Sequence, residues 1–127
     1  MAKGTRFATI LDGLEVVMGL GIHPEELAAP QRVILNVRLE VDYPVPPAED
    51  RIEAVLDYDF IRTGIRELVA GRHFNLQETL CEAVAALCLR DERVCEVTVR
   101  SSKPDIYPDA AVGCEIVRAR LAALVRP

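Results

Sequence analysis

The amino-acid sequence predicts an α+β protein, in which two helices cover one face of a four-stranded antiparallel sheet. Two kinds of apolar pattern support this prediction. Apolar and polar side chains alternate through residues 5–22, 32–43, 95–102 and 112–116, whereas apolar side chains recur every three or four positions between residues 59 and 90. Alternation is typical of half-buried strands, and the longer spacing is typical of amphipathic helices. The resulting order is β-β-α-α-β-β, and this grouping of strands and helices is typical of α+β proteins.

The first third of the chain predicts a long β-hairpin. In residues 5–22 the apolar side chains stand mainly at even positions, and an irregularity is expected at Asp12 and Gly13. Residues 32–43 alternate more regularly, so one face of that strand should be buried and the other polar. Residues 23–29 connect the two strands. Three prolines in the four residues after the second strand end the pairing, because proline cannot donate a ladder hydrogen bond.

The rest of the chain predicts the helices. One helical turn is expected at residues 52–55, within the loop that leaves the hairpin. Longer helices are expected over residues 59–70, with Gly71 as the stop signal, and over residues 76–90. A short terminal helix is expected at residues 119–125, after the last strand.

The composition limits the classes of function. Half of the 127 residues are hydrophobic and 28% are charged, so residues 1–127 are expected to form one soluble domain. The formal net charge of −5 argues against nucleic acid as a partner, because binding phosphates requires a basic surface. No run of eighteen apolar residues occurs, and Asp12 and Glu15 interrupt the N-terminal apolar stretch. Neither a membrane span nor a signal peptide is therefore predicted.

The four cysteines and two histidines are not arranged like a metal site, so no metal is predicted. Free cysteine packs as a small hydrophobic side chain, and reduced thiols indicate a cytoplasmic protein. An open four-stranded sheet has two edges whose unpaired backbone groups invite pairing with another chain. We therefore expect a homo-oligomer assembled strand to strand.

Glu78 is the first candidate for a small-molecule site. It follows Asn75 by three residues at the start of a predicted helix, an arrangement that fits a capping box and explains both residues without a ligand. The same carboxylate could accept two parallel N–H bonds, such as those that the edge of a 2-amino-4-oxo-pyrimidine donates. Both interpretations stay open at this point.

Three further residues would complete such a site. Lys103 is the only internal lysine in a chain with thirteen arginines, and it is either a solvated loop residue or a base, because lysine, unlike arginine, can lose its proton in a pocket. Tyr58 either packs over a helix end or relays a proton, and the neighbouring Asp57 is expected to cap the helix. Glu26 lies beside Glu25 in a turn, where both would ordinarily be solvated.

Several motifs in order make the chain resemble the dihydroneopterin aldolase family over about residues 8–120. The matching stretches share their sequence and spacing with that family; they are the Gly21-to-Glu26 turn, Pro30-Gln31-Arg32-Val33, Val55-Leu56-Asp57-Tyr58, Asn75-Leu76-Gln77-Glu78-Thr79-Leu80, Val99-Arg100-Ser101-Ser102-Lys103-Pro104 and Val112-Gly113-Cys114-Glu115-Ile116. The resemblance implies the tunnelling fold, whose subunits join edge to edge into a ring, usually a tetramer that stacks into an octamer. Two stretches depart from the family pattern, namely residues 18–20 and the loop at residues 105–110.

The resemblance implies a lyase of folate biosynthesis that uses neither a metal nor a Schiff base and needs no cofactor. It would split 7,8-dihydroneopterin into 6-hydroxymethyl-7,8-dihydropterin and glycolaldehyde by a retro-aldol reaction. By position, Glu78 would hold the amino and N3 groups of the pterin. Lys103 would be the general base and Tyr58, from a neighbouring subunit, would help to return a proton to carbon. Glu26 would orient the substrate side chain.

The resemblance further implies backbone contacts with the pterin ring near Leu56 and Gln77. Two alternatives use the same scaffold. An epimerase acting on dihydroneopterin or its triphosphate would use the same residues, and a triphosphate would require several basic residues at the pocket mouth. A pterin- or purine-binding protein without catalysis would need Glu78 but not Lys103.

Overall fold

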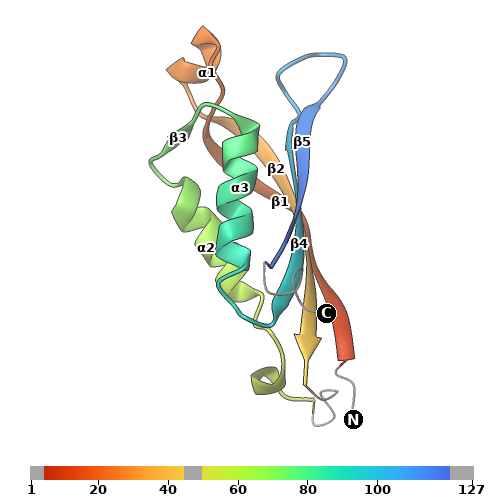
Figure 1. The fold of residues 1–127 in the computed structure, drawn as a ribbon. Coiled ribbons are helices and arrows are strands. Elements are labelled where there is room, and N and C mark those ends of the chain that lie inside the picture. Colours follow the sequence, from red (N-terminus) through yellow and green to blue (C-terminus); the bar gives the residue numbers. More distant parts are fainter. Residues whose placement is uncertain (1–4, 45–49, 121–127) are drawn as a thin grey trace.

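The computed structural model of the protein describes residues 5–44 and 50–120 and shows a long, curved sheet covered on one face by two helices (Figure 1). The strands are β1 (Thr5–Leu20), β2 (Gln31–Tyr43), β3 (His73–Phe74), β4 (Val94–Lys103) and β5 (Val112–Ala119). The helices are α1 (Pro24–Ala28), the 3-10 turn η1 (Ile52–Ala54), α2 (Asp59–Val69) and α3 (Gln77–Cys88). The α+β class is confirmed, and both long helices and the turn at residues 52–55 lie where the sequence places them.

The sheet has five strands in the order β3-β1-β2-β4-β5, so the prediction of four antiparallel strands is wrong in one respect. The four long strands pair antiparallel, but β3 pairs parallel to the end of β1, through Gly19 with His73 and Leu20 with Phe74. Two residues are too few to show an alternating pattern, which is why the sequence does not reveal β3.

The connection at residues 23–29 contains the helix α1, which the sequence did not predict. Pro24 is its first residue, a position where the missing N–H of proline is harmless. The expected terminal helix does not begin at residue 119, because Ala119 pairs with Glu96 as the last residue of β5. The remainder of that expected helix lies outside the described residues.

The irregularity expected at Asp12 and Gly13 is a β-bulge. Leu11 pairs with Val37 and Leu14 with Leu35, so β1 has one residue more than β2 at this point. Gly13 adopts a φ of 71°, and its N–H donates to Oδ1 of Asn36 at 2.6 Å.

The bulge also reverses which residues of β1 face the helices. From Leu14 onward the even-numbered side chains are buried, as expected. Before the bulge the odd-numbered positions face that side, because Leu11 pairs with the buried Val37. Ala8 and Ile10, which belong to the even-numbered apolar pattern, therefore face away from the helices, and Ile10 is 61% exposed.

One hydrophobic core lies between the sheet and the helices α2 and α3. Ile61 and Ile65 of α2 and Leu80 and Val84 of α3 are fully buried against strands β1, β2 and β4. Burying side chains of this size stabilises a fold by roughly 1.5–3 kcal/mol each. These contacts hold both helices on the sheet, and they thereby fix where the ends of the helices lie. Within the described residues, no helix has the length and hydropathy required to cross a membrane.

The turn between β1 and α1 depends on Gly21. Its φ is 116°, a conformation that side chains rarely adopt, and its N–H donates to the carbonyl of Phe74 at 2.9 Å. A Cβ atom added to Gly21 would overlap the carboxylate of Glu26. Gly71, which follows α2, also has a positive φ of 63°, but a Cβ atom there would meet nothing within 4 Å.

These two glycines give a matched prediction for stability. Gly71→Ala should lower the free energy of unfolding by about 1 kcal/mol, because only backbone strain is added. Gly21→Ala should lower it by roughly 3 kcal/mol or more, because strain and overlap with Glu26 act together. Urea denaturation of both variants at one protein concentration measures the difference. Equal losses in the two variants would show that the packing of Gly21 on Glu26 does not matter.

Candidate active site

The sequence-predicted site residues lie in two separate cavities of the subunit. Glu26, Gln77, Glu78 and Lys103 line a cavity of about 250 Å³, formed where α1, the start of α3 and the adjoining ends of β4 and β5 meet. Leu56 and Tyr58 line another, of about 300 Å³, beside the first residues of β1. The two cavities share no residue, and they lie toward opposite ends of the sheet (Figure 1).

The first cavity contains a buried ion pair between α1 and the end of β4. Lys103 Nζ lies 2.7 Å from Glu26 Oε2, and the two side chains are only 12% and 3% exposed. Gln31 Nε2 donates to the same carboxylate oxygen at 2.8 Å, and the backbone N–H of His23 donates to Oε1 at 3.3 Å. Both side chains are therefore shielded from solvent. The interpretations of Glu26 as a solvated turn residue and of Lys103 as a solvated loop residue are wrong.

The environment of Glu26 keeps its carboxylate ionised. Burial alone would raise the pKa of Glu26, but hydrogen bonds from Lys103, Gln31 and the backbone of His23 together lower that pKa to about 2. A carboxylate with three donors, one of them an ammonium group at contact distance, is held in its charged form. The pair therefore presents an ionised carboxylate and, 2.7 Å from it, the amino group of Lys103 to the cavity before any ligand enters.

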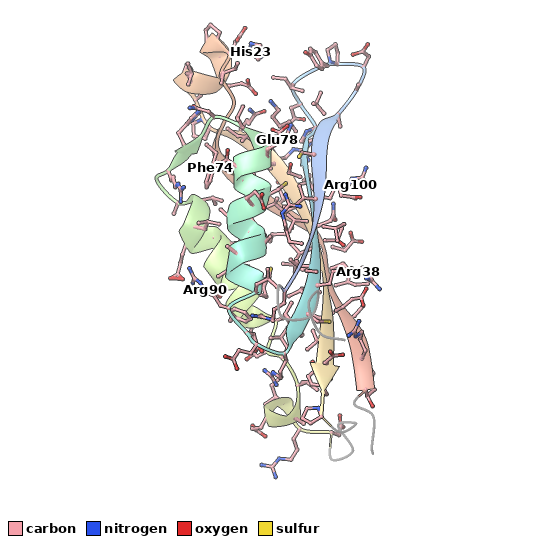
Figure 2. All side chains as sticks on the ribbon, viewed as in Figure 1. His23, Arg38, Phe74, Glu78, Arg90 and Arg100 are labelled. Carbon is pink, nitrogen blue, oxygen red and sulfur yellow. The ribbon has the colours of Figure 1, made fainter. Side chains whose placement is uncertain are left out.

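Glu78 is exposed and lines this cavity from the N-terminal end of α3 (Figure 2). The predicted capping box is wrong: α3 begins at Gln77, Leu76 is its N-cap residue, and no side chain caps it. Glu78 is thus the second helical residue, not the third, and Asn75 does not explain its position. A carboxylate at a helix N-terminus is stabilised by the helix dipole and is free to accept hydrogen bonds from a ligand.

Gln77 belongs to a polar cluster that the sequence analysis did not find. The hydroxyl group of Ser101, which is fully buried on β4, donates to Gln77 Oε1 at 2.8 Å. The thiol of Cys81 lies 3.5 Å from Ser101 Oγ. The sequence feature that could have revealed this cluster is Ser101 itself, because it is a polar residue at a position where the alternation of the strand predicts a buried side chain.

The second cavity is built around aromatic side chains. Phe7 and Tyr43 line it together with Leu56 and Tyr58. Tyr58 is 57% exposed, so packing over the helix end does not account for it. Leu56 is buried, and its N–H donates to the hydroxyl group of Tyr43 at 3.0 Å, which leaves only its carbonyl available to a ligand.

Asp57 bonds to the start of α2 as expected, although the N-cap residue of this helix is Tyr58 and not Asp57. Its Oδ1 accepts a hydrogen bond from the N–H of Asp59 at 2.9 Å, which fixes the start of α2. Tyr58 lies between these two residues, so this hydrogen bond also fixes the backbone that carries the tyrosine.

The low pKa of Glu26 predicts how stability depends on pH. Because the folded-state pKa lies below that of an unfolded glutamate, Glu26 stabilises the fold above about pH 5, and this stabilisation is lost as the pH falls toward about 2. The stability difference between the wild type and Glu26→Gln should therefore shrink by up to about 3 kcal/mol between about pH 6 and pH 2.

Chemical denaturation across this pH range measures the effect. Glu25→Gln is the matched control, because Glu25 is exposed, and its stability difference from the wild type should stay nearly constant. A difference for Glu26→Gln that does not change with pH would contradict an ionised, paired carboxylate.

Comparisons with known proteins agree with the fold and the motifs. A model of the FolB dihydroneopterin aldolase family matches residues 9–117. A dihydroneopterin aldolase from Streptomyces coelicolor is 32% identical over 114 residues, which cover 87% of this chain and 96% of the relative.

Solved structures give the same result. A dihydroneopterin aldolase from Burkholderia thailandensis bound to guanine has a TM-score of 0.76 and 40% identity, and the match covers 93% of both chains. The Escherichia coli dihydroneopterin aldolase in complex with neopterin has a TM-score of 0.77 at 23% identity, covering 89% of this chain and 99% of that one, and so shows the shared fold. The resemblance in the sequence is confirmed, and the chain belongs to the dihydroneopterin aldolase family.

Proposed function

We propose that this protein is a lyase of folate biosynthesis that cleaves 7,8-dihydroneopterin into 6-hydroxymethyl-7,8-dihydropterin and glycolaldehyde. The observation that carries this proposal is the buried Glu26–Lys103 pair, which lines the same cavity as Glu78 in a chain of this family. A carboxylate that holds the pterin and a paired lysine that acts on its side chain are two of the groups that the proposed reaction requires.

Recognition of the pterin ring falls to Glu78. Its exposed carboxylate can accept two parallel hydrogen bonds, from the 2-amino group and from N3–H of the ring. The related Burkholderia protein is bound to guanine, which offers an amino group and an adjacent ring N–H in the same arrangement. Glu78 already lines the cavity, so it can make the proposed contact with the pterin ring without moving.

The proposed reaction moves one proton from oxygen to carbon. Lys103 in its neutral amine form, acting through a water molecule, accepts the proton of the second hydroxyl group of the side chain and becomes the ammonium form. The bond between the first and second side-chain carbons then breaks, the second carbon becomes the aldehyde of glycolaldehyde, and the electron pair moves into the C=N bond of the dihydropterin ring. A proton returned to the first carbon gives the hydroxymethyl product. The ring itself accepts the electrons, so the proposed mechanism needs neither a metal nor a Schiff base.

Glu26 and Tyr58 have supporting roles in this proposal. Glu26, fixed by three donors, orients the lysine, the water and the substrate hydroxyl groups, an arrangement that lowers the barrier because little reorganisation is needed. Tyr58 takes part in returning the proton to carbon. Since it lines a cavity that contains neither Glu78 nor Lys103, we propose that each complete site takes Tyr58 and Leu56 from a neighbouring subunit.

The open sheet supports such an assembly. Within the described residues β5 pairs only with β4, and β3 covers only the last two residues of the outer edge of β1. Unpaired edges of this length favour pairing between chains, and a head-to-tail interface forms a ring when the rotation between subunits closes. We propose a homo-oligomeric ring of four subunits, which can stack into an octamer. The four free cysteines support a cytoplasmic location, where thiols stay reduced.

The proposal predicts both products and the effect of removing the lysine. Anaerobic incubation with 7,8-dihydroneopterin, without added metal, should yield the hydroxymethyl product and glycolaldehyde. In Lys103→Met, kcat should fall by about 10²–10⁴-fold while the affinity for pterin stays within a few-fold, because Lys103 acts on the side chain and Glu78 holds the ring.

Chromatography of the reaction mixtures and pterin titration measure these effects. Arg100→Ala is the matched control, because Arg100 is a cation of the same strand that is exposed and lines neither cavity. If the wild type converts dihydroneopterin only to its epimer, the epimerase alternative replaces the aldolase. If it binds pterin and forms no product, the protein is a pterin-binding protein.

A further inference from the structure

The buried cluster behind the candidate active site has a definite hydrogen-bond direction. Ser101 is fully buried, and its hydroxyl group has one proton to donate. Two neighbours could accept that proton: Gln77 Oε1 at 2.8 Å and the Cys81 sulfur at 3.5 Å. A carboxamide oxygen is a strong acceptor and a thiol sulfur a weak one, so the hydroxyl group donates to Gln77.

Cys81 completes the chain of hydrogen bonds from the other side. Burial raises the pKa of its thiol to about 11, so the thiol stays protonated at neutral pH and acts as a donor. It can donate to Ser101 Oγ at 3.5 Å or to the carbonyl of Cys114 at 3.7 Å. In either case Ser101 keeps its own proton for Gln77.

This direction determines which end of the Gln77 side chain faces the ligand. With Oε1 turned toward Ser101, the Nε2 amide group is the part of the carboxamide left for the cavity, which Gln77 lines next to Glu78 and Gly113. The cavity wall thus offers an amide donor beside a carboxylate acceptor. Both the amide of Gln77 and the carboxylate of Glu78 are side-chain groups, so they are additional to the backbone contact that the family resemblance implies near Gln77.

We propose that the Gln77 side chain donates a hydrogen bond to the 4-oxo oxygen of the pterin, and that Ser101 is the positioning residue that holds the carboxamide in this orientation. The edge of a 2-amino-4-oxo ring presents two donors, the amino group and N3–H, followed by one acceptor, O4. Glu78 and Gln77 match this order with an acceptor pair and a donor. This inference rests on the proposed function, because it assigns a further specificity determinant within the same site.

The test compares two ligands that differ in one atom. Pterin and 4-thiopterin share the amino group and N3–H, but sulfur replaces O4 and accepts hydrogen bonds weakly. The quantity measured is the ratio of the two dissociation constants, thio over oxo, obtained by fluorescence titration of the intact protein. Any effect of the larger sulfur atom that is common to all variants cancels when ratios are compared.

In Gln77→Met the ratio should fall about fivefold relative to the wild type, the loss expected for one neutral hydrogen bond. Ser101→Ala should lower the ratio by less than Gln77→Met does, because the carboxamide of Gln77 is then free to turn but can still donate. Ser102→Ala is the matched control, since Ser102 is the next residue on β4 and faces the opposite side of the sheet, and its ratio should not change.

Gln77→Glu provides a second variant that keeps the length of the side chain and the hydrogen bond from Ser101. It replaces the donor by an acceptor, so it should weaken pterin more than 4-thiopterin. An unchanged ratio in both Gln77 variants, or an equal loss of affinity for both ligands, overturns the inference and leaves Gln77 a structural role. Failure of the wild type to bind either ligand overturns the proposed function instead, together with this inference.

Discussion

The buried ion pair between Glu26 and Lys103 is the constraint on which the site depends. The two residues are 77 positions apart in the sequence, and their contact holds the short helix α1 against the end of β4. Removing water from both charges is costly. The fold tolerates it because Gln31 donates to the carboxylate oxygen that contacts Lys103, and the backbone N–H of His23 donates to the other oxygen. Loss of one partner would leave the other charge buried alone, typically a loss of about 3–5 kcal/mol. The geometry needed for the proposed chemistry therefore also stabilises the position of α1 on the sheet.

The second constraint is that one subunit holds only parts of the proposed site. The pterin-facing Glu78 and the Glu26–Lys103 pair share a cavity, whereas Leu56 and Tyr58 line another. The same sheet that separates these cavities has long unpaired edges within the described residues. In the proposed assembly, pairing of these edges brings the aromatic cavity of one subunit beside the charged cavity of the next. Under this account, assembly and activity are linked, since neither cavity alone contains all the groups that the reaction requires.

The sequence was sufficient for the long elements and insufficient for the contacts between them. The alternation through β2 and the helical spacing through α2 and α3 are patterns within short stretches of sequence, and each predicts its element correctly. The two residues of β3 are too short for any pattern, and the bulge at Gly13 was located without its consequence, which is that Ile10 turns to the other face. Glu26 and Lys103 each resemble solvated residues when considered alone, because their burial arises from contacts between segments that are far apart in the sequence. The family motifs singled out both residues, but only the fold shows Ser101 orienting Gln77.

The most direct test of the central claim, that neighbouring subunits share each site, is complementation between two inactive variants. Lys103→Met and Tyr58→Phe should each be nearly inactive alone. If Lys103 and Tyr58 of one site come from different subunits, co-expression in equal amounts should restore activity to about one quarter of the sites, because random assembly pairs two intact halves at that frequency. If both residues act within one subunit, every site in the hybrid carries one defect, and the co-expressed protein will be no more active than a mixture of the two purified variants. That second result would contradict the shared site.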